Sequence, residues 1–71
     1  MVDFQYVDSK NVDQIGYDSD ALELHVIFKK SGICYIYTGV PPEVFEEMMN
    51  ATSKGTFLNT RIKGVYEFRK C

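Results

Sequence analysis

The sequence has little of several features that mark particular protein classes. Its 71 residues include no tryptophan, one histidine, two prolines and two cysteines. Two cysteines are too few for a disulfide-stapled scaffold, and Cys34 and Cys71 lie too far apart in sequence to form a local metal-binding motif. We therefore expect reduced thiols, no metal site and no cofactor.

Long hydrophobic runs are also missing. No stretch reaches the length needed to cross a bilayer, and residues 1–5 contain neither a basic nor an apolar targeting segment, so we expect a cytoplasmic protein without membrane contact. The formal net charge is only −2, but the charges are unevenly distributed. Residues 53–71 form a basic island, which is either a solvated face or a surface for anions. Its cations are Lys54, Arg61, Lys63, Arg69 and Lys70.

The chain does contain enough apolar and aromatic material to fold. Hydrophobic residues make up 45% of it, including five tyrosines and five phenylalanines, and this composition argues against disorder. A single domain, residues 1–71, accounts for the whole length. A domain of this size buries only roughly 60% of the surface of its unfolded chain, so its core needs support.

Hydrophobic periodicity predicts strands first and helices second. Alternating apolar residues indicate a short strand over residues 2–6, a weaker one over 12–18, and a secure one over 22–28. Residues 33–37 complete a hairpin, and Gly39 with the proline pair at 41–42 ends it.

A helical pattern then covers residues 43–52, and Ser53 suits the N-cap of a second helix that ends near Gly64. Residues 65–68 alternate again, as a short strand or an extended tail. The expected class is α+β: a small antiparallel β-meander of three to four strands, followed by two short helices and a C-terminal extended segment.

The hairpin is expected to turn at residues 31–32. A two-residue loop pairs Phe28 with Tyr35 and Val26 with Tyr37. Both tyrosines then lie on the core face. The same register sets Ile27 opposite Ile36, with Cys34 beside them on the other face. Either a terminal segment or a second copy of the chain covers this apolar cluster, and we favour a homo-oligomer with Ile27, Cys34 and Ile36 at its interface.

The turn at residues 51–56 combines a helix N-terminus with hydroxyl groups, a lysine and a glycine, as phosphate-binding turns do. It lacks the glycine spacing of a Walker A loop, and an ordinary N-cap is the alternative interpretation. Basic and amide side chains follow on the next helix, and a tyrosine beyond it offers a stacking surface. The candidate ligand-binding residues are Ser53, Lys54, Gly55, Thr56, Asn59, Arg61, Lys63 and Tyr66.

The candidate catalytic residues are few. His25 is the single histidine, and the expected hairpin brings Cys34 within reach of it on one face, the arrangement of a cysteine hydrolase. No oxyanion donor or third orienting group accompanies the pair. We interpret His25 as structural and expect no enzymatic activity.

Several of these segments together resemble the KTSC family, a short domain named after the C-terminus of some lysyl-tRNA synthetases and also found as stand-alone bacterial and phage proteins. The resemblance runs from about residue 6 to residue 68. It departs from the family at Asp8-Ser9, where two serines are usual. It implies a small β-then-α domain without known enzymatic activity, for which the synthetase context suggests RNA binding. The segments that carry it are Ile15-Gly16-Tyr17-Asp18, the strand 22–28, Gly32 with Tyr35-Ile36-Tyr37, Val40-Pro41, and Ala51, Ser53 and Gly55 with Asn59 and Ile62.

The sequence therefore favours a small non-catalytic binding module for a phosphate-bearing ligand, either RNA or a nucleotide. A phage-type protein that sequesters a nucleotide is one form of this hypothesis, since low net charge suits a compact ligand. The alternative is a protein–protein adaptor that acts as a homo-oligomer through the Ile27 and Ile36 face.

Overall fold

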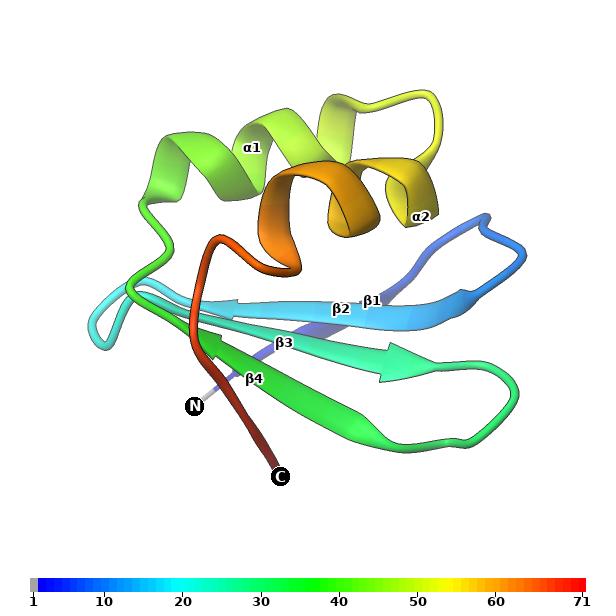
Figure 1. The fold of residues 1–71 in the computed structure, drawn as a ribbon, viewed down its shortest axis with the longest axis horizontal. Helices are drawn as coiled ribbons and strands as arrows, with labels where there is room; N and C mark the ends of the chain where they lie inside the picture. The colour runs from blue at the N-terminus through cyan, green and yellow to red at the C-terminus, as the bar shows by residue number, and fades with distance from the viewer. Residues whose placement is uncertain (1) are drawn as a thin grey trace.

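The structure, a computed structural model, describes residues 2–71 and consists of two layers, a twisted sheet and a layer of helices on one of its faces (Figure 1). The chain first builds four strands, then crosses to the helices, and returns beside β4 at its C-terminal end. The elements are β1 (Phe4–Tyr6), β2 (Val12–Asp18), β3 (Glu23–Phe28), β4 (Cys34–Thr38), α1 (Pro42–Asn50), α2 (Lys54–Phe57), the π-helical turn η1 (Leu58–Ile62) and β5 (Phe68–Lys70).

The sheet has five strands in the order β1-β2-β3-β4-β5, and each neighbouring pair is antiparallel. The α+β class is therefore correct, but the expected three to four strands undercount the sheet. The C-terminal segment supplies the additional strand, because Phe68 pairs with Tyr37 and Lys70 with Tyr35 at the free edge of β4. β5 begins three residues later in the sequence than the predicted segment 65–68.

The hairpin between β3 and β4 has a longer loop than predicted. Val26 pairs with Tyr35 and Leu24 with Tyr37, a shift of two residues from the expected register. A four-residue loop, 29–32, explains the shift: Phe28 N donates to Ile33 O, and Gly32, at a φ of 67°, donates its N–H to Phe28 O. Because a strand's side chains alternate with a period of two, the shift leaves every residue on its predicted face.

The core lies between the sheet and the helices. Leu24 and Val26 from β3 and Ile15 from β2 face the helices and are fully buried. Their partners from the helical layer are Met48, Leu58 and Ile62, which are also buried. The described residues include no helix long and apolar enough to cross a membrane.

Both helices begin where local chemistry favours a helix start. Pro42 occupies the first position of α1, where a missing N–H costs nothing, and α1 ends at Asn50, two residues before the predicted end. Ser53 caps α2 as predicted, since its Oγ accepts a hydrogen bond from Thr56 N at 3.2 Å. The helix continues into η1, where Lys63 N donates to Leu58 O at 2.8 Å, and the chain leaves it before Gly64, whose φ is 78°.

The N-terminal strand lies on the face away from the helices. Phe4 pairs with Gly16 and Tyr6 with Gln14, so both aromatic side chains point to the face opposite the core. A Cβ atom at Gly16 would lie 2.5 Å from Val2 Cγ1 and 3.3 Å from Phe4 Cδ2. Gly16 therefore permits the close approach of the N-terminal segment, whose Asp3 O would lie 3.3 Å from the same Cβ. The irregular pairing of β2 occurs elsewhere, between Val12 and Gln14.

Candidate functional site: a basic and aromatic groove

The predicted phosphate turn lies at the start of α2 and faces the loop between β1 and β2. Gly55 is buried, with Asn11 Nδ2 and Ser9 Oγ 3.5 Å and 3.6 Å from the place where its Cβ would stand. Ser9 Oγ accepts hydrogen bonds from the amides of Asn11 and Val12, both at 3.3 Å. Two hydroxyl-capped turns thus meet at this point, one from each layer of the fold.

These two turns line a hollow of about 400 Å³, which we call the turn hollow. Lys10 and Asp8 from the loop also line it, so its charges are mixed. The ammonium group of Lys54 donates to Ala51 O at 3.1 Å and helps to fix the turn. Five of the predicted ligand-binding residues meet here: Ser53, Lys54, Gly55, Thr56 and Asn59.

A second hollow, of about 430 Å³, lies between the end of η1 and the strands β3, β4 and β5. We call it the aromatic hollow, because four rings line it: Phe28, Tyr35, Tyr37 and Phe68. Adjacent rings are in contact, with centroids 5.4 Å apart for Phe28 and Tyr35 and 5.3 Å apart for Tyr35 and Phe68, both edge to face. Lys63 Nζ lies 5.4 Å from the centre of the Phe28 ring and places a cation at the same hollow.

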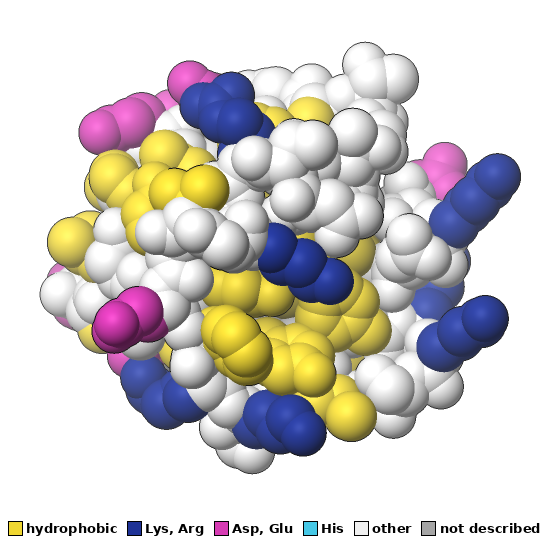
Figure 2. Space-filling view, viewed as in Figure 1, with side chains coloured by type: hydrophobic (Ala, Val, Ile, Leu, Met, Phe, Trp, Pro, Cys, Tyr) yellow, Lys and Arg dark blue, Asp and Glu magenta, His cyan; other side chains and the backbone are white. Residues whose placement is uncertain are grey.

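A smaller hollow of about 230 Å³ connects these two. It shares Asn11, Gly55 and Asn59 with the turn hollow, and Phe28 and Lys63 with the aromatic hollow. The three hollows therefore adjoin along the junction of the two layers, and we call them together the groove. Figure 2 shows hydrophobic side chains gathered between the helices and the sheet on this face, with basic side chains among and around them.

The sequence indicated one end of this groove but not the other. The structure places six of the predicted ligand-binding residues along the groove: Ser53 to Thr56, Asn59 and Lys63. The aromatic hollow was not predicted. Tyr35 and Tyr37 alternate on the predicted core face, and this pattern indicated packing rather than a binding surface. The missing information was that β5 would place Phe68, 60% exposed, beside them.

Two predicted ligand-binding residues lie outside the groove. Arg61 Nη2 bonds to Glu47 Oε2 of α1 at 3.1 Å, and its guanidinium lies over the Phe57 ring. Tyr66 is half-buried and packs against the core. The structure therefore does not bring Arg61 and the Ser53 turn together around one anion.

The other face of the sheet holds the residues predicted for self-association. Ile36 is only 8% exposed, and the paired position on β5 is Arg69, whose Nη2 lies 2.9 Å from Glu23 Oε2. The Phe4 ring packs edge to face on His25 at 5.9 Å. Both ends of the chain thus contribute to covering this face. A terminal segment was one of the two covers expected for it, and a second copy of the chain was the other.

The cysteines are paired, contrary to the expectation of reduced thiols. Cys34 in β4 and Cys71 after β5 form a disulfide, with Cα atoms 5.3 Å apart. The pairing was not predicted because a separation of 37 residues gives no local signal, whereas the β4–β5 ladder places the two side by side. In this state Cys34 is not a free nucleophile for His25.

Burial raises the pKa of the Tyr37 hydroxyl, and the neighbouring Tyr35 raises it further. Its hydroxyl can donate or accept hydrogen bonds at the floor of the aromatic hollow.

Comparison with known proteins identifies the family. The KTSC domain profile matches residues 8–66, and the chain belongs to this family. A crystal structure of a KTSC domain protein from Yersinia pestis is 38% identical, with a TM-score of 0.95, over 100% of this chain and 99% of the other.

Two further relatives are 39% identical over 59 residues, or 83% of this chain. One is a protein of Tsukamurella paurometabola, 87% of which is matched. The other is a lysine–tRNA ligase of Nostoc punctiforme, and there the match spans 10% of the protein.

Proposed function

We propose that this KTSC domain is a non-catalytic binding module for a nucleotide unit, either free or within single-stranded RNA, and that the ligand lies along the groove. The observation that carries the proposal is that the three hollows of the groove adjoin through shared lining residues. The groove offers aromatic rings at one end, amide and hydroxyl groups at the other, and Lys63 between them.

The aromatic hollow suits a nucleobase. Proteins bind unpaired bases by stacking them on aromatic rings, at about 1–3 kcal/mol per base. Phe68 is the best-placed ring for such stacking because it is 60% exposed and also touches Tyr35 and Tyr37. The Tyr37 hydroxyl adds a hydrogen-bonding group beside the stacked base.

The phosphate groups of the ligand are assigned to the basic side chains of the groove. Lys63 stands at the border of two hollows, and Lys30 and Lys10 line the middle and turn hollows. Within residues 2–71, no acceptor is found for the backbone amides of Lys54 and Gly55 in the first turn of α2. Asp8 opposes an anion in the turn hollow, so we place the main phosphate contact at Lys63.

One relative supports RNA as the source of the nucleotide unit. It is named as a lysine–tRNA ligase, and the segment it shares with this chain is a tenth of its length. A small module appended to a protein that handles tRNA is suited to hold single-stranded RNA, in which bases are free to stack.

Fluorescence anisotropy with a labelled single-stranded RNA of mixed sequence, measured at several salt concentrations, tests the proposal. Mononucleotides are compared by titration calorimetry, which separates a free nucleotide from RNA. We expect Lys63→Gln to weaken RNA binding and to reduce the slope of log K against log salt by about 0.7, the value for one phosphate contact in a single strand. We expect Phe68→Ala to weaken binding about 5- to 150-fold without changing that slope.

Arg61→Gln is the matched control, because Arg61 is also an exposed cation near the end of η1 but pairs with Glu47 outside the groove. It should leave affinity nearly unchanged. The proposal fails if neither RNA nor mononucleotides bind at low salt. It also fails if Lys63→Gln and Phe68→Ala weaken binding no more than Arg61→Gln does.

Self-association through the face opposite the helices is the second candidate. Tyr6 on this face is 79% exposed and Phe4 is partly exposed, and both lie on the edge strand β1. An exposed edge with aromatic side chains is a typical place for strands of two copies to meet. Sedimentation equilibrium tests this: a mass of one chain at high concentration, unaltered by Tyr6→Lys, contradicts it.

A further inference from the structure

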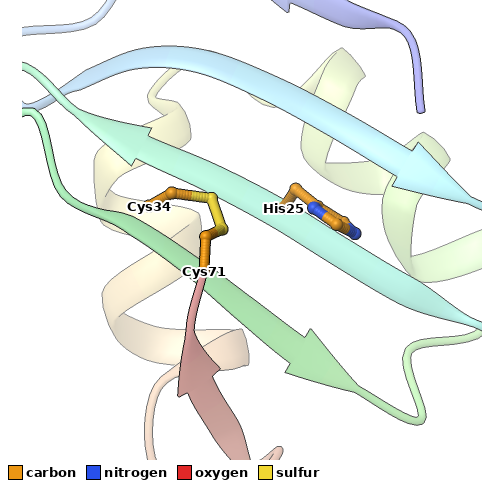
Figure 3. A group of neighbouring side chains, drawn as sticks. All are labelled: His25, Cys34 and Cys71. Atoms are coloured by element: carbon orange, nitrogen blue, oxygen red, sulfur yellow. A yellow bond between two sulfur atoms is a disulfide. The ribbon is translucent and has the colours of Figure 1, made fainter. Parts of the chain in front are cut away.

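Three side chains that bind soft metal ions meet on the sheet face opposite the helices. Cys34 lies in β4, Cys71 follows β5, and His25 lies in β3. One ring nitrogen of His25 and both sulfur atoms lie within 4.8 Å of one another. Figure 3 shows that the ring nitrogen nearer the backbone, Nδ1, lies on the side of the disulfide, while the other, Nε2, points away from it.

We propose that reduction converts this cluster into a zinc site in which Cys34 Sγ, Cys71 Sγ and His25 Nδ1 bind one Zn²⁺. A dithiol reductant supplies two electrons and two protons, the S–S bond breaks, and the reductant leaves as its own disulfide. Zinc then binds the two thiols as thiolates and releases their two protons to solvent. The oxidised protein, whose sulfur atoms are bonded to each other, does not bind the ion in this way.

The donor set and its dimensions fit zinc. Two thiolates and an imidazole are common zinc ligands, with Zn–S distances of about 2.3 Å and Zn–N distances of about 2.0–2.1 Å. A tetrahedral ion with these bonds holds its donor atoms about 3.5–3.8 Å apart. Donors already within 4.8 Å reach that spacing by side-chain rotation once the S–S bond is broken. Water completes the tetrahedron at the fourth position.

The surroundings of His25 also match a metal ligand. Its Nε2 is buried and has no hydrogen-bond partner, and the nearest carboxylate oxygen, Glu23 Oε1, is 3.8 Å away. The other oxygen of Glu23 is held by Arg69 Nη2 at 2.9 Å. When Nδ1 binds zinc, Nε2 carries the proton and points it toward Glu23, the histidine–carboxylate pair that commonly orients a metal-bound imidazole.

Titration of the reduced protein with Co²⁺ as the spectroscopic probe for zinc tests the proposal. We expect one Co²⁺ per chain, with the near-ultraviolet charge-transfer band of cobalt–thiolate bonds, and no such band before reduction. Cys71→Ser should lose most of the band. His25→Gln should bind at least 10-fold more weakly, and Glu23→Gln about 10-fold more weakly. Glu47→Gln is the matched control, because its carboxylate pairs with Arg61 on the helical layer.

Two measurements on the unaltered chain keep the test decisive if a variant fails to fold. Native mass spectrometry should show that the reduced chain with Zn²⁺ is heavier than the reduced metal-free chain by the mass of one zinc less two protons. Because the sequence contains one histidine, its ring ¹⁵N signals are assigned without ambiguity, and Nδ1 should shift when zinc binds. Absence of the cobalt–thiolate band in the reduced chain overturns the proposal, as does an unchanged Nδ1 signal or equal affinity of His25→Gln and the unaltered protein.

Discussion

Breaking the disulfide between Cys34 and Cys71 should cost this domain a large part of its stability. The bond closes a chain segment with a sequence separation of 37, and the loop-entropy relation gives about 4 kcal/mol for a loop of this size. A domain of 71 residues has a free energy of unfolding of roughly 4–11 kcal/mol. At this size each kcal/mol corresponds to about 4–8 °C, so we expect the Tm to fall by roughly 15–30 °C.

The assay is urea unfolding followed by circular dichroism, with and without a reductant, and with a chelator present so that no metal compensates. Cys71→Ser is the suitable variant because Cys71 is exposed, whereas Cys34 is partly buried. In the presence of reductant, Cys71→Ser and the unaltered protein should unfold at the same urea concentration. Titration of free thiols before reduction confirms that the starting material is oxidised.

The result that refutes the reasoning is a fully oxidised protein whose unfolding free energy changes by less than about 1 kcal/mol on reduction. Loop closure would then not be the source of stability. A further expected consequence is local. Amide exchange of β5 should rise most on reduction, because β5 has only three residues and pairs with the sheet along one edge.

Three further predictions concern the core, the N-terminal strand and the response to pH. Leu58→Ala should lower the unfolding free energy by about 2–5 kcal/mol in urea titrations, since Leu58 is buried and its loss leaves a cavity; a cost below about 1 kcal/mol would contradict this packing. Gly16→Ala should cost about 1–3 kcal/mol and increase amide exchange in β1, because its Cβ would lie 2.5 Å from Val2 Cγ1; unchanged exchange would place the N-terminal segment elsewhere. Burial, and then the Glu43 and Asp18 carboxylates, raise the pKa of Tyr17 in the folded state. The stability that this raised pKa contributes is therefore complete below about pH 10 and is lost as the pH rises through the folded pKa. Tyr17→Phe should accordingly lose less stability than the unaltered protein when thermal melts are compared between about pH 9 and 12.

The groove illustrates why the candidate site was only partly predictable. Ser53 and Gly55 were identified because capping and close approach leave a signature within a few residues of sequence. The contribution of Phe68 depended on where the last strand pairs, which local pattern does not specify. The same limit applies to Arg61, whose partner Glu47 lies 14 residues away on α1.

The sequence by itself determined the order of strands and helices, the side of the sheet on which each residue of β3 and β4 lies, and the start of both helices. These features depend on the two-residue period of a strand, on the fixed φ of proline and on the Ser53 cap, all of which act over a few residues. Tertiary structure alone decided the hairpin register, the capture of β1 and β5 at the edges of the sheet, and the Cys34–Cys71 bond. Those outcomes depend on contacts between distant segments, whose gain in burial and hydrogen bonding must exceed the entropy lost when the chain between them is closed.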